Sequence, residues 1–555
     1  MKEIIIKGEK MKQFYKIVPI VIFTSMLIFS GSLNAQDTLV VEWVDGSGII
    51  NNSLFDAIVG DTTATGERAN LNRVYKLRQG GFYYLTETIQ NDGFPLNIVG
   101  EKGDPSDEFA NPPMIQLKPR EDATLAGKML NIRGDFTLKN VIFNGKTTLG
   151  DLLYEVIDVR ADGGTFLFDN VTFEYAQWGI AGFYSENADI TFTNNRWRNL
   201  LSENQPWGGR GFSVWADVDS IIVENNTFLN IGGFTFQIEG ATANYFAFNQ
   251  NTIVNNGRQL ILGSWLQEAY ITNNLILNSH WQGESLAEIG EDRLASTDEQ
   301  YAGMFTIVDL PAEYGLNAQR NIVIANNAFF LESDFATFFV NNENVRRQPL
   351  VNVRTQNLFD ANENMVIQDN SFDETDPGFD TYPDNNQERI QFINDIRSGA
   401  TNVQLHYWDP GRDANNESIQ WPFPEDLTYS NSSFKTGAIG GYPLGDLNWY
   451  PSDKSTWKSN RDAQYEAIKD LLGKPVEVTY QGTVEAEDGA LSGLAEEGTV
   501  TIENRRIVRI EASGDIVWDN VEVAAGTYDV LVSKRTWVKS QILCKNKIGQ
   551  AASSK

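Results

Sequence analysis

The chain has 555 residues, of which 41% are hydrophobic and 12% aromatic, so it can build a large core and is not an intrinsically disordered protein. Its formal charge of −30 excludes nucleic acid as a partner, because binding to polyphosphate requires a basic footprint. The single cysteine, Cys544, excludes an internal disulfide framework.

The first segment has the pattern of a secretory signal. Lys12 and Lys16 precede an apolar run over residues 17–29, and Ala35 closes a stretch that suits cleavage. We expect residues 1–35 to be removed, with an uncleaved anchor as the alternative. No later run approaches the roughly 20 apolar residues that span a bilayer. The protein is therefore expected to be a monomer that is secreted or at the cell surface, with the periplasm as the alternative, and to have no membrane span.

The chain then enters a region of short strands. Residues 72–77 and 81–85 alternate between apolar and polar side chains, as strands do. Residues 53–58 are expected to form a short helix over the exposed end of the strands. Such a cap is needed because an unpaired sheet edge would template aggregation.

One short phrase, a polar pair followed by apolar residues, then returns along the chain. Alternating runs of strand length precede and follow each pair, and the first six repeats are 23 to 31 residues apart. A unit this short cannot bury its own apolar face, so successive units must stack. The second polar position falls at Asn140, Asn170, Asn195, Asn226, Asn251, Asn274, Asn327 and Asn370.

This repeat predicts an all-β fold over residues 36–450, a parallel β-helix with three strands and three turns per coil. Asparagines of successive coils would lie roughly 4.8 Å apart and could form a hydrogen-bonded ladder. Asparagine also tolerates the left-handed backbone of a sharp turn. We therefore interpret these asparagines as turn structure and not as ligands.

The C-terminal part changes style. Residues 451–475 carry Trp457, Tyr465 and Ile468 at helical spacing and are expected to form a helical linker. Residues 476–533 read as short strands of a partial β-sandwich module. Residues 534–555 are basic and unlike the rest, which suggests the hypothesis of a truncated or frame-shifted end.

Tryptophans and arginines are the candidate binding residues. Five tryptophans lie in or beside the first strand of a coil or the loop before it, where indoles could stack on sugar rings, although core packing is the alternative for each. These are Trp178, Trp207, Trp215, Trp265 and Trp281. Arg210 and Arg258 each precede a ladder asparagine by 16 residues, so they are expected at equivalent positions two coils apart. There they could clamp a carboxylate or sulfate, with surface ion pairing as the alternative.

Two acids could form a catalytic pair. Asp217 and Glu239 fall near the ends of successive first strands. Side chains one coil apart start about 4.8 Å from each other, near the roughly 5–5.5 Å between the carboxyl groups of retaining glycosidases. The alternative is that both are solvated turn residues.

Residues 120–450 resemble the right-handed parallel β-helix proteins of the pectate-lyase and chondroitinase-B type. Glu485 to Glu487 resemble the start of a β-sandwich carbohydrate-binding module. The first resemblance implies a polysaccharide lyase that cleaves a uronic-acid polymer by β-elimination. It would use Arg210 or Arg258 at the carboxylate, Asp217 and Glu239 as acid or base, and calcium held by Asp158. A glycoside hydrolase is less favoured, and a non-catalytic cell-surface protein that binds or displays glycans is the alternative, so enzymatic activity stays open.

Overall fold

The computed structural model describes residues 37–473, apart from 103–110, 207, 285–302, 343–344, 346, 369–373, 402 and 411–420. It also describes the backbone of four strands between residues 476 and 518. The side chains of Glu239 and of residues 262–264 are not described. The expected signal, the basic tail and the phrase at Asn370 lie outside the described residues.

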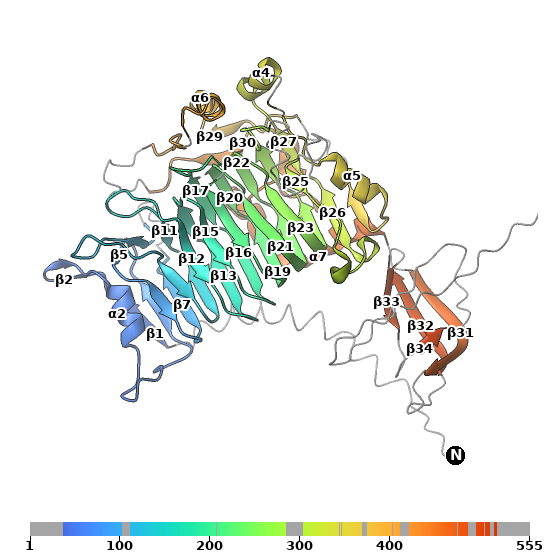
Figure 1. Cartoon of the computed structure of the whole chain (residues 1–555), viewed down its shortest axis with the longest axis horizontal. Helices are drawn as coiled ribbons and strands as arrows, with labels where there is room; N and C mark the ends of the chain where they lie inside the picture. Colours follow the sequence, from blue (N-terminus) through green and yellow to red (C-terminus); the bar gives the residue numbers. More distant parts are fainter. Residues whose placement is uncertain are drawn as a thin grey trace, which may run out of the picture.

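The strands form three parallel series that wind around one axis (Figure 1), which confirms the predicted parallel β-helix. The first series contains β6 (Ile89–Asn91), β9 (Leu130–Ile132), β12 (Glu155–Val159), β15 (Gly179–Phe183), β18 (Arg210–Val214), the first parts of β21 (Phe236–Asn249) and β23 (Ile261–Thr272), and β25 (Phe305–Thr306).

The second series contains β1 (Thr38–Val41), β4 (Val74–Leu77), β7 (Leu96–Gly100), β10 (Phe136–Lys139), β13 (Thr165–Asp169), β16 (Asp189–Thr193), β19 (Val218–Glu224), the later parts of β21 and β23, β26 (Asn321–Ala325) and β28 (Met365–Ile367). The third contains β5 (Phe82–Leu85), β8 (Met114–Leu117), β11 (Ile142–Asn144), β14 (Thr172–Glu174), β17 (Arg196–Leu200), β20 (Thr227–Ile231), β22 (Thr252–Asn256), β24 (Leu275–Leu277) and β27 (Ala328–Phe330).

The core is a stack of aromatic rings. The pairing of β13, β16 and β19 puts inward residues of successive coils above one another. Phe168 of β13 stacks on its register partner Phe192 of β16 with 4.7 Å between ring centroids, and Phe192 also stacks on Phe212 of β18, a first-series strand of the next coil, at 4.6 Å. All three side chains are fully buried, so this register places the apolar face of each coil against its neighbours.

The asparagine ladder is present and buried. The Nδ2 of Asn226 donates to Asn251 Oδ1 at 3.0 Å, and Asn251 donates to Asn274 at 3.0 Å. In the later pairs the left-handed backbone belongs to the first residue, with φ of 52° at Asn225 and 58° at Gln250, whereas in the first two pairs it belongs to the second, with φ of 55° at Asn140 and 56° at Asn170. In the later pairs, therefore, the first residue forms the turn and the second forms the ladder.

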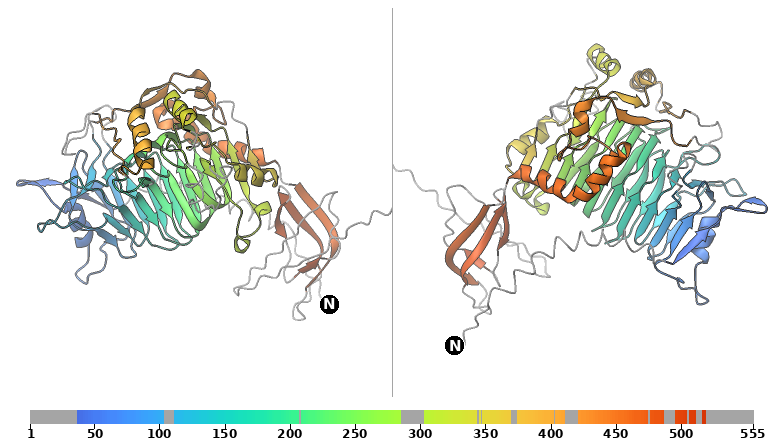
Figure 2. Two further views of the ribbon diagram at one scale, coloured as in Figure 1. Left: turned by 45° about the horizontal axis from the view of Figure 1, so that its top comes forward. Right: turned by 180° about the vertical axis from the view of Figure 1, so that it is seen from behind.

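Two of the three series are covered from outside. The helix α7 (Pro451–Lys469) packs Tyr465 and Ile468 onto second-series residues such as Tyr270, as the view from behind shows (Figure 2). Arg461 of α7 also pairs with the buried Glu224 at 2.9 Å. The expected linker is thus a helix that forms part of the β-helix body, because its apolar side is buried on the sheet.

The third series is covered by the segment around the antiparallel pair β29 (Phe379–Thr381) and β30 (Asp426–Tyr429). In Figure 1, α4 (Ser333–Asn341) and α6 (Asn386–Arg397) lie above the strands and α5 (Val353–Asp360) lies at the right, so none of these helices lies in front of the first series.

The expected N-terminal helix is α2 (Ser53–Gly60), beside the hairpin of β2 (Val44–Asp45) and β3 (Gly48–Ile49).

The C-terminal strands form one antiparallel sheet in the order β33, β32, β31 and β34. Their bounds are β31 (Val476–Ala486), β32 (Ala495–Glu503), β33 (Arg506–Ile510) and β34 (Ile516–Trp518). The predicted sandwich therefore stays a prediction beyond this sheet. Within the described residues, every helix is too short or too polar to cross a bilayer.

Candidate functional site

A row of long side chains crosses the first series where its strands end. Arg133, Arg160, Tyr184 and Trp215 are the first residues after β9, β12, β15 and β18. The parallel pairing aligns the last residues of these four strands, so the four side chains follow one another at the coil spacing of about 4.8 Å. We call these four residues the end row.

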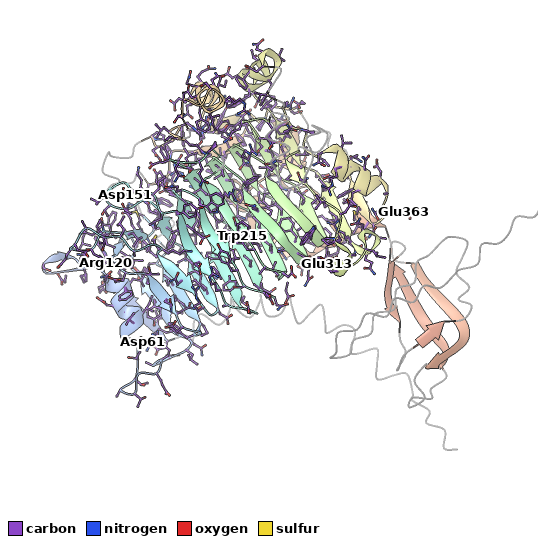
Figure 3. All side chains as sticks on the ribbon, viewed as in Figure 1. Asp61, Arg120, Asp151, Trp215, Glu313 and Glu363 are labelled. Carbon is purple, nitrogen blue, oxygen red and sulfur yellow. The ribbon has the colours of Figure 1, made fainter. Side chains whose placement is uncertain are left out.

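The end row consists of two cations followed by two stacked rings. The Arg160 guanidinium carbon lies 4.1 Å from the centre of the Tyr184 ring. The Tyr184 and Trp215 rings are nearly parallel, with 6.4 Å between centroids and 11° between planes. Figure 3 shows Trp215 at the middle of the strands that face the viewer. A half-buried aromatic pair thus continues the line of guanidinium groups.

Two acids lie underneath the cations. Asp158 accepts from Lys128 at 3.0 Å, and its carboxylate pairs with Arg133 at 2.9 Å and with Arg160 at 3.0 Å. Lys128 also pairs with Glu155. The acidic side chains are only 6% and 7% exposed, whereas the cationic ones are 28% to 52% exposed. The cations are therefore exposed to solvent, and the buried acids fix their positions through ion pairs.

The electrostatics of Asp158 follow from this arrangement. Burial opposes ionisation of its carboxyl, but hydrogen bonds from Arg160 and Lys128 outweigh burial and lower the pKa. Asp158 is thus charged at neutral pH. A glycine makes room for the second acid, because a Cβ at Gly182 would lie 2.2 Å from the Glu155 Oε2.

Tyr184 connects the acids to the rings. Its hydroxyl donates to Glu155 Oε2 at 3.4 Å. Burial, followed by the charges of Glu155 and Asp158, raises the pKa of Tyr184 to about 12. The hydroxyl therefore keeps its proton at neutral pH and can donate it to a ligand oxygen.

A second aromatic stack lies where the same strands begin. Tyr154 and Trp178 directly precede β12 and β15, and their rings lie 5.5 Å apart with 10° between planes. The guanidinium carbon of Arg210 lies 3.8 Å from the Trp178 ring centre. Tyr154 is 52% exposed. We call Tyr154 and Trp178 the start pair, and its exposed ring offers a second flat apolar surface.

The structure places the two predicted arginines two coils apart and within one residue of the same register position, but below the surface. Gly211 donates its N–H to Phe234 O and Arg258 donates its N–H to Gly233 O, so Arg210 and Arg258 lie two coils apart, as the spacing predicts. Arg210 is 4% exposed and donates to Gln237, while Arg258 is 8% exposed and pairs with Glu284 at 2.9 Å. Both guanidinium groups are engaged within the protein, which does not suit direct contact with a polymer.

The structure does not bring Asp217 together with these arginines. Arg210 begins β18, whereas Asp217 follows its far end and accepts from the Thr242 N–H at 2.9 Å. Asp217 also interacts with Tyr314, whose ring lies 5.0 Å from that of Trp265. The side chain of Glu239 lies outside the described residues.

The prediction that Trp281 lies on the surface and binds a ligand is wrong. Trp281 is fully buried and packs against Phe335, Phe392 and His406. The turn before the next coil folds this indole into the core, so it is not exposed to a ligand. Trp207 lies outside the described residues.

The surroundings of Asp158 do not fit the calcium ion that the resemblance implies. Three cationic side chains occupy its oxygens and would repel a divalent cation. In the described part of the chain, no group of three or more His, Cys, Asp or Glu side chains could hold a metal ion.

The residues that build this face were largely missed in the sequence. The sequence patterns of tryptophans and acid pairs do not point to Lys128, Arg133, Glu155, Arg160 or Tyr184, because those patterns ignore position within the coil. The available signal is positional: the residue directly after β9, β12, β15 and β18 is Arg, Arg, Tyr and Trp in turn. Reading one column across the coils would have found the row.

The comparison with protein families agrees with the fold. A comparison with curated proteins found no match. The parallel β-helix is a scaffold of carbohydrate-active and surface proteins alike, so the activity has to be argued from the site. Residues 136–290, which include β10 to β24 and most of the candidate face, match the family described as a right handed beta helix region.

Proposed function

We propose that this protein binds an acidic polysaccharide on the first-series face. The observation that carries the proposal is the layering at Asp158: the buried acid fixes Lys128, Arg133 and Arg160, which stay accessible to solvent. We further propose that the protein acts outside the cytoplasm as a monomer, with the polysaccharide as its partner.

The chemistry of the face suits an anionic sugar chain. Guanidinium groups bind carboxylates and sulfates through paired N–H donors. The Tyr184 and Trp215 rings beside them offer apolar faces for sugar rings. Because the ion pairs already fix the cations, binding costs less side-chain entropy than it would with free arginines. The three cations also make a locally basic patch in a chain of charge −30.

Calorimetric titration of the purified protein with a panel of polysaccharides tests the proposal. Pectate, alginate and glycosaminoglycans supply the acidic members, and an uncharged glucan supplies the control. We expect binding to at least one acidic polymer, weakening as salt is added because exposed charges are screened. Equal binding to the uncharged glucan, or no binding to any acidic polymer, would contradict the proposal.

Cleavage by β-elimination is the second candidate, and Tyr184 is the observation that favours it. Elimination needs a cation at the uronate carboxylate, a base for the proton beside it and an acid for the leaving oxygen. Arg160 can supply the first and the protonated Tyr184 hydroxyl the third. Lys128 donates to Glu155 and Asp158 in this structure, so it would act as the base only after passing one of its protons to one of these carboxylates or to water.

The unsaturated product of elimination absorbs in the ultraviolet, so a rise in absorbance reports the reaction. If the protein is a lyase, Tyr184→Phe should abolish this rise while retaining polymer binding, because the ring stays and the proton donor is lost. If acidic polymers bind but none gives a rise in absorbance, the lyase activity is refuted and the binding function is retained.

A further inference from the structure

Building on the proposed binding function, we propose that a single polysaccharide chain lies along the strands of this face and contacts the start pair and the end row together. The start pair is a sugar-binding position separate from the cations. This fixes the direction of the chain, across the coil axis.

The start pair and the end row share two strands, β12 and β15. Tyr154 and Arg160 bracket β12, and Trp178 and Tyr184 bracket β15. Each pair is six residues apart along an extended strand, which corresponds to about 20 Å. Only a chain of several sugars can reach both stacks.

The surface between the stacks is suited to the charged part of such a chain. Lys128 pairs with Glu155, the residue directly after Tyr154, and also with Asp158, which pairs with Arg160. A path from Tyr154 to Tyr184 therefore passes Lys128 and then Arg160. An aromatic surface occurs at each end and cations occur between them.

A chain that followed the coil axis along the end row would meet a different set of groups. It would pass Arg133, Arg160, Tyr184 and Trp215 and would not reach Tyr154, which lies at the opposite end of the strand. The two directions thus differ in one measurable respect, the dependence of affinity on Tyr154.

Affinity as a function of oligosaccharide length tests the inference. Oligomers of increasing length, prepared from the acidic polymer that binds the wild type, are titrated into the wild type and into Tyr154→Ala, Tyr154→Trp and Val340→Ala. Val340 is an exposed apolar residue on α4, 79% exposed, and its variant controls for loss of surface apolar area. Circular dichroism confirms that each variant is folded.

We expect wild-type affinity to rise once the oligomer is long enough to span both stacks. Tyr154→Ala should remove that rise, weakening long oligomers about two- to tenfold and leaving short ones unchanged. Tyr154→Trp should restore the rise, and Val340→Ala should behave as the wild type.

Long oligomers that bind Tyr154→Ala as tightly as the wild type would overturn the spanning chain and leave the proposed function standing. Absence of binding to any acidic polymer would instead overturn the proposed function itself. An equal loss for Val340→Ala would show that the Tyr154 effect is not specific, and would also overturn the inference.

Discussion

Asp158 is 6% exposed, whereas Arg160, which donates to its carboxylate at 3.0 Å, is 52% exposed. The acid belongs to the interior layer of the face and the cation belongs to its surface. Since Asp158 also pairs with Lys128 and Arg133, one buried carboxylate positions three cations. Removing the acid and removing a cation should therefore have opposite effects on net charge but similar effects on binding.

Asp158→Asn separates positioning from net charge. The substitution makes the face more positive by one charge, so an account based on charge alone expects tighter binding of an acidic polymer. We expect weaker binding by about 1 kcal/mol, roughly fivefold, because the three cations lose the charge-assisted hydrogen bonds that fix them. Calorimetric titration at constant ionic strength measures the difference, and tighter binding would count against the positioning role.

Trp215→Ala tests the aromatic part of the end row. The indole stacks on Tyr184 and is half-buried, so its loss removes both a sugar platform and the support of the neighbouring ring. We expect affinity to fall by about 1 kcal/mol or more, while the fold is retained. Trp421→Ala is the matched control, because Trp421 packs against Phe423 and the third series, away from the first. A similar loss in both variants would refute a local role for Trp215.

Asn251→Ala tests the ladder that holds the coils together. The buried side chain donates to Val223 O and to Asn274 Oδ1, both at 3.0 Å, and accepts from Asn226. Its removal leaves buried partners unsatisfied, which should lower the free energy of unfolding by about 2–4 kcal/mol. Urea denaturation measures this loss. Asn460→Ala, on the exposed side of α7, should change the free energy by less than about 0.5 kcal/mol.

Asp446→Asn tests a buried carboxyl beneath the α7 region. Asp446 accepts from the Thr227 hydroxyl at 2.7 Å, and burial raises its pKa from 3.8 to about 6. Because the folded-state pKa is the higher one, its contribution to stability is full below pH 4 and is lost as pH rises through 6. Asparagine cannot ionise, so the variant should gain about 2–3 kcal/mol relative to the wild type between pH 4 and pH 7.5. Denaturation at both pH values measures the gain, and a constant difference would contradict the raised pKa.

The coil architecture could be predicted from the sequence because it depends on local rules that repeat. Strand-length alternation and a polar pair at each corner define the period, and stacking follows from the need to bury one face. The sequence does not show which residue of a pair forms the left-handed turn, since the turn falls on the first residue at Gln250, with the ladder on Asn251, but on the second residue at Asn140. Gln250 carries no obvious sign of that turn.

The candidate site could be predicted only in part. Trp178 and Trp215 were placed on the correct side, but residue type alone could not separate them from Trp281, which the corner turns into the core. The sequence also does not show which arginine is exposed. Arg160 and Arg210 both belong to first-series coils, but the Arg160 side chain is 52% exposed and Arg210 is 4% exposed. Those differences arise from contacts between coils, which a single sequence does not display.

The most direct test of the account compares Arg160→Ala with Arg347→Ala in titration against the acidic polymer that the wild type binds. Arg347 is a matched cation at the C-terminal end of the β-helix, where it pairs with Glu374 and lies over Phe329 of β27, the last strand of the third series. We expect Arg160→Ala to weaken binding at least fivefold, which corresponds to about 1 kcal/mol, while Arg347→Ala binds as the wild type does. Equal affinities for the two variants would contradict a binding face built on Arg160.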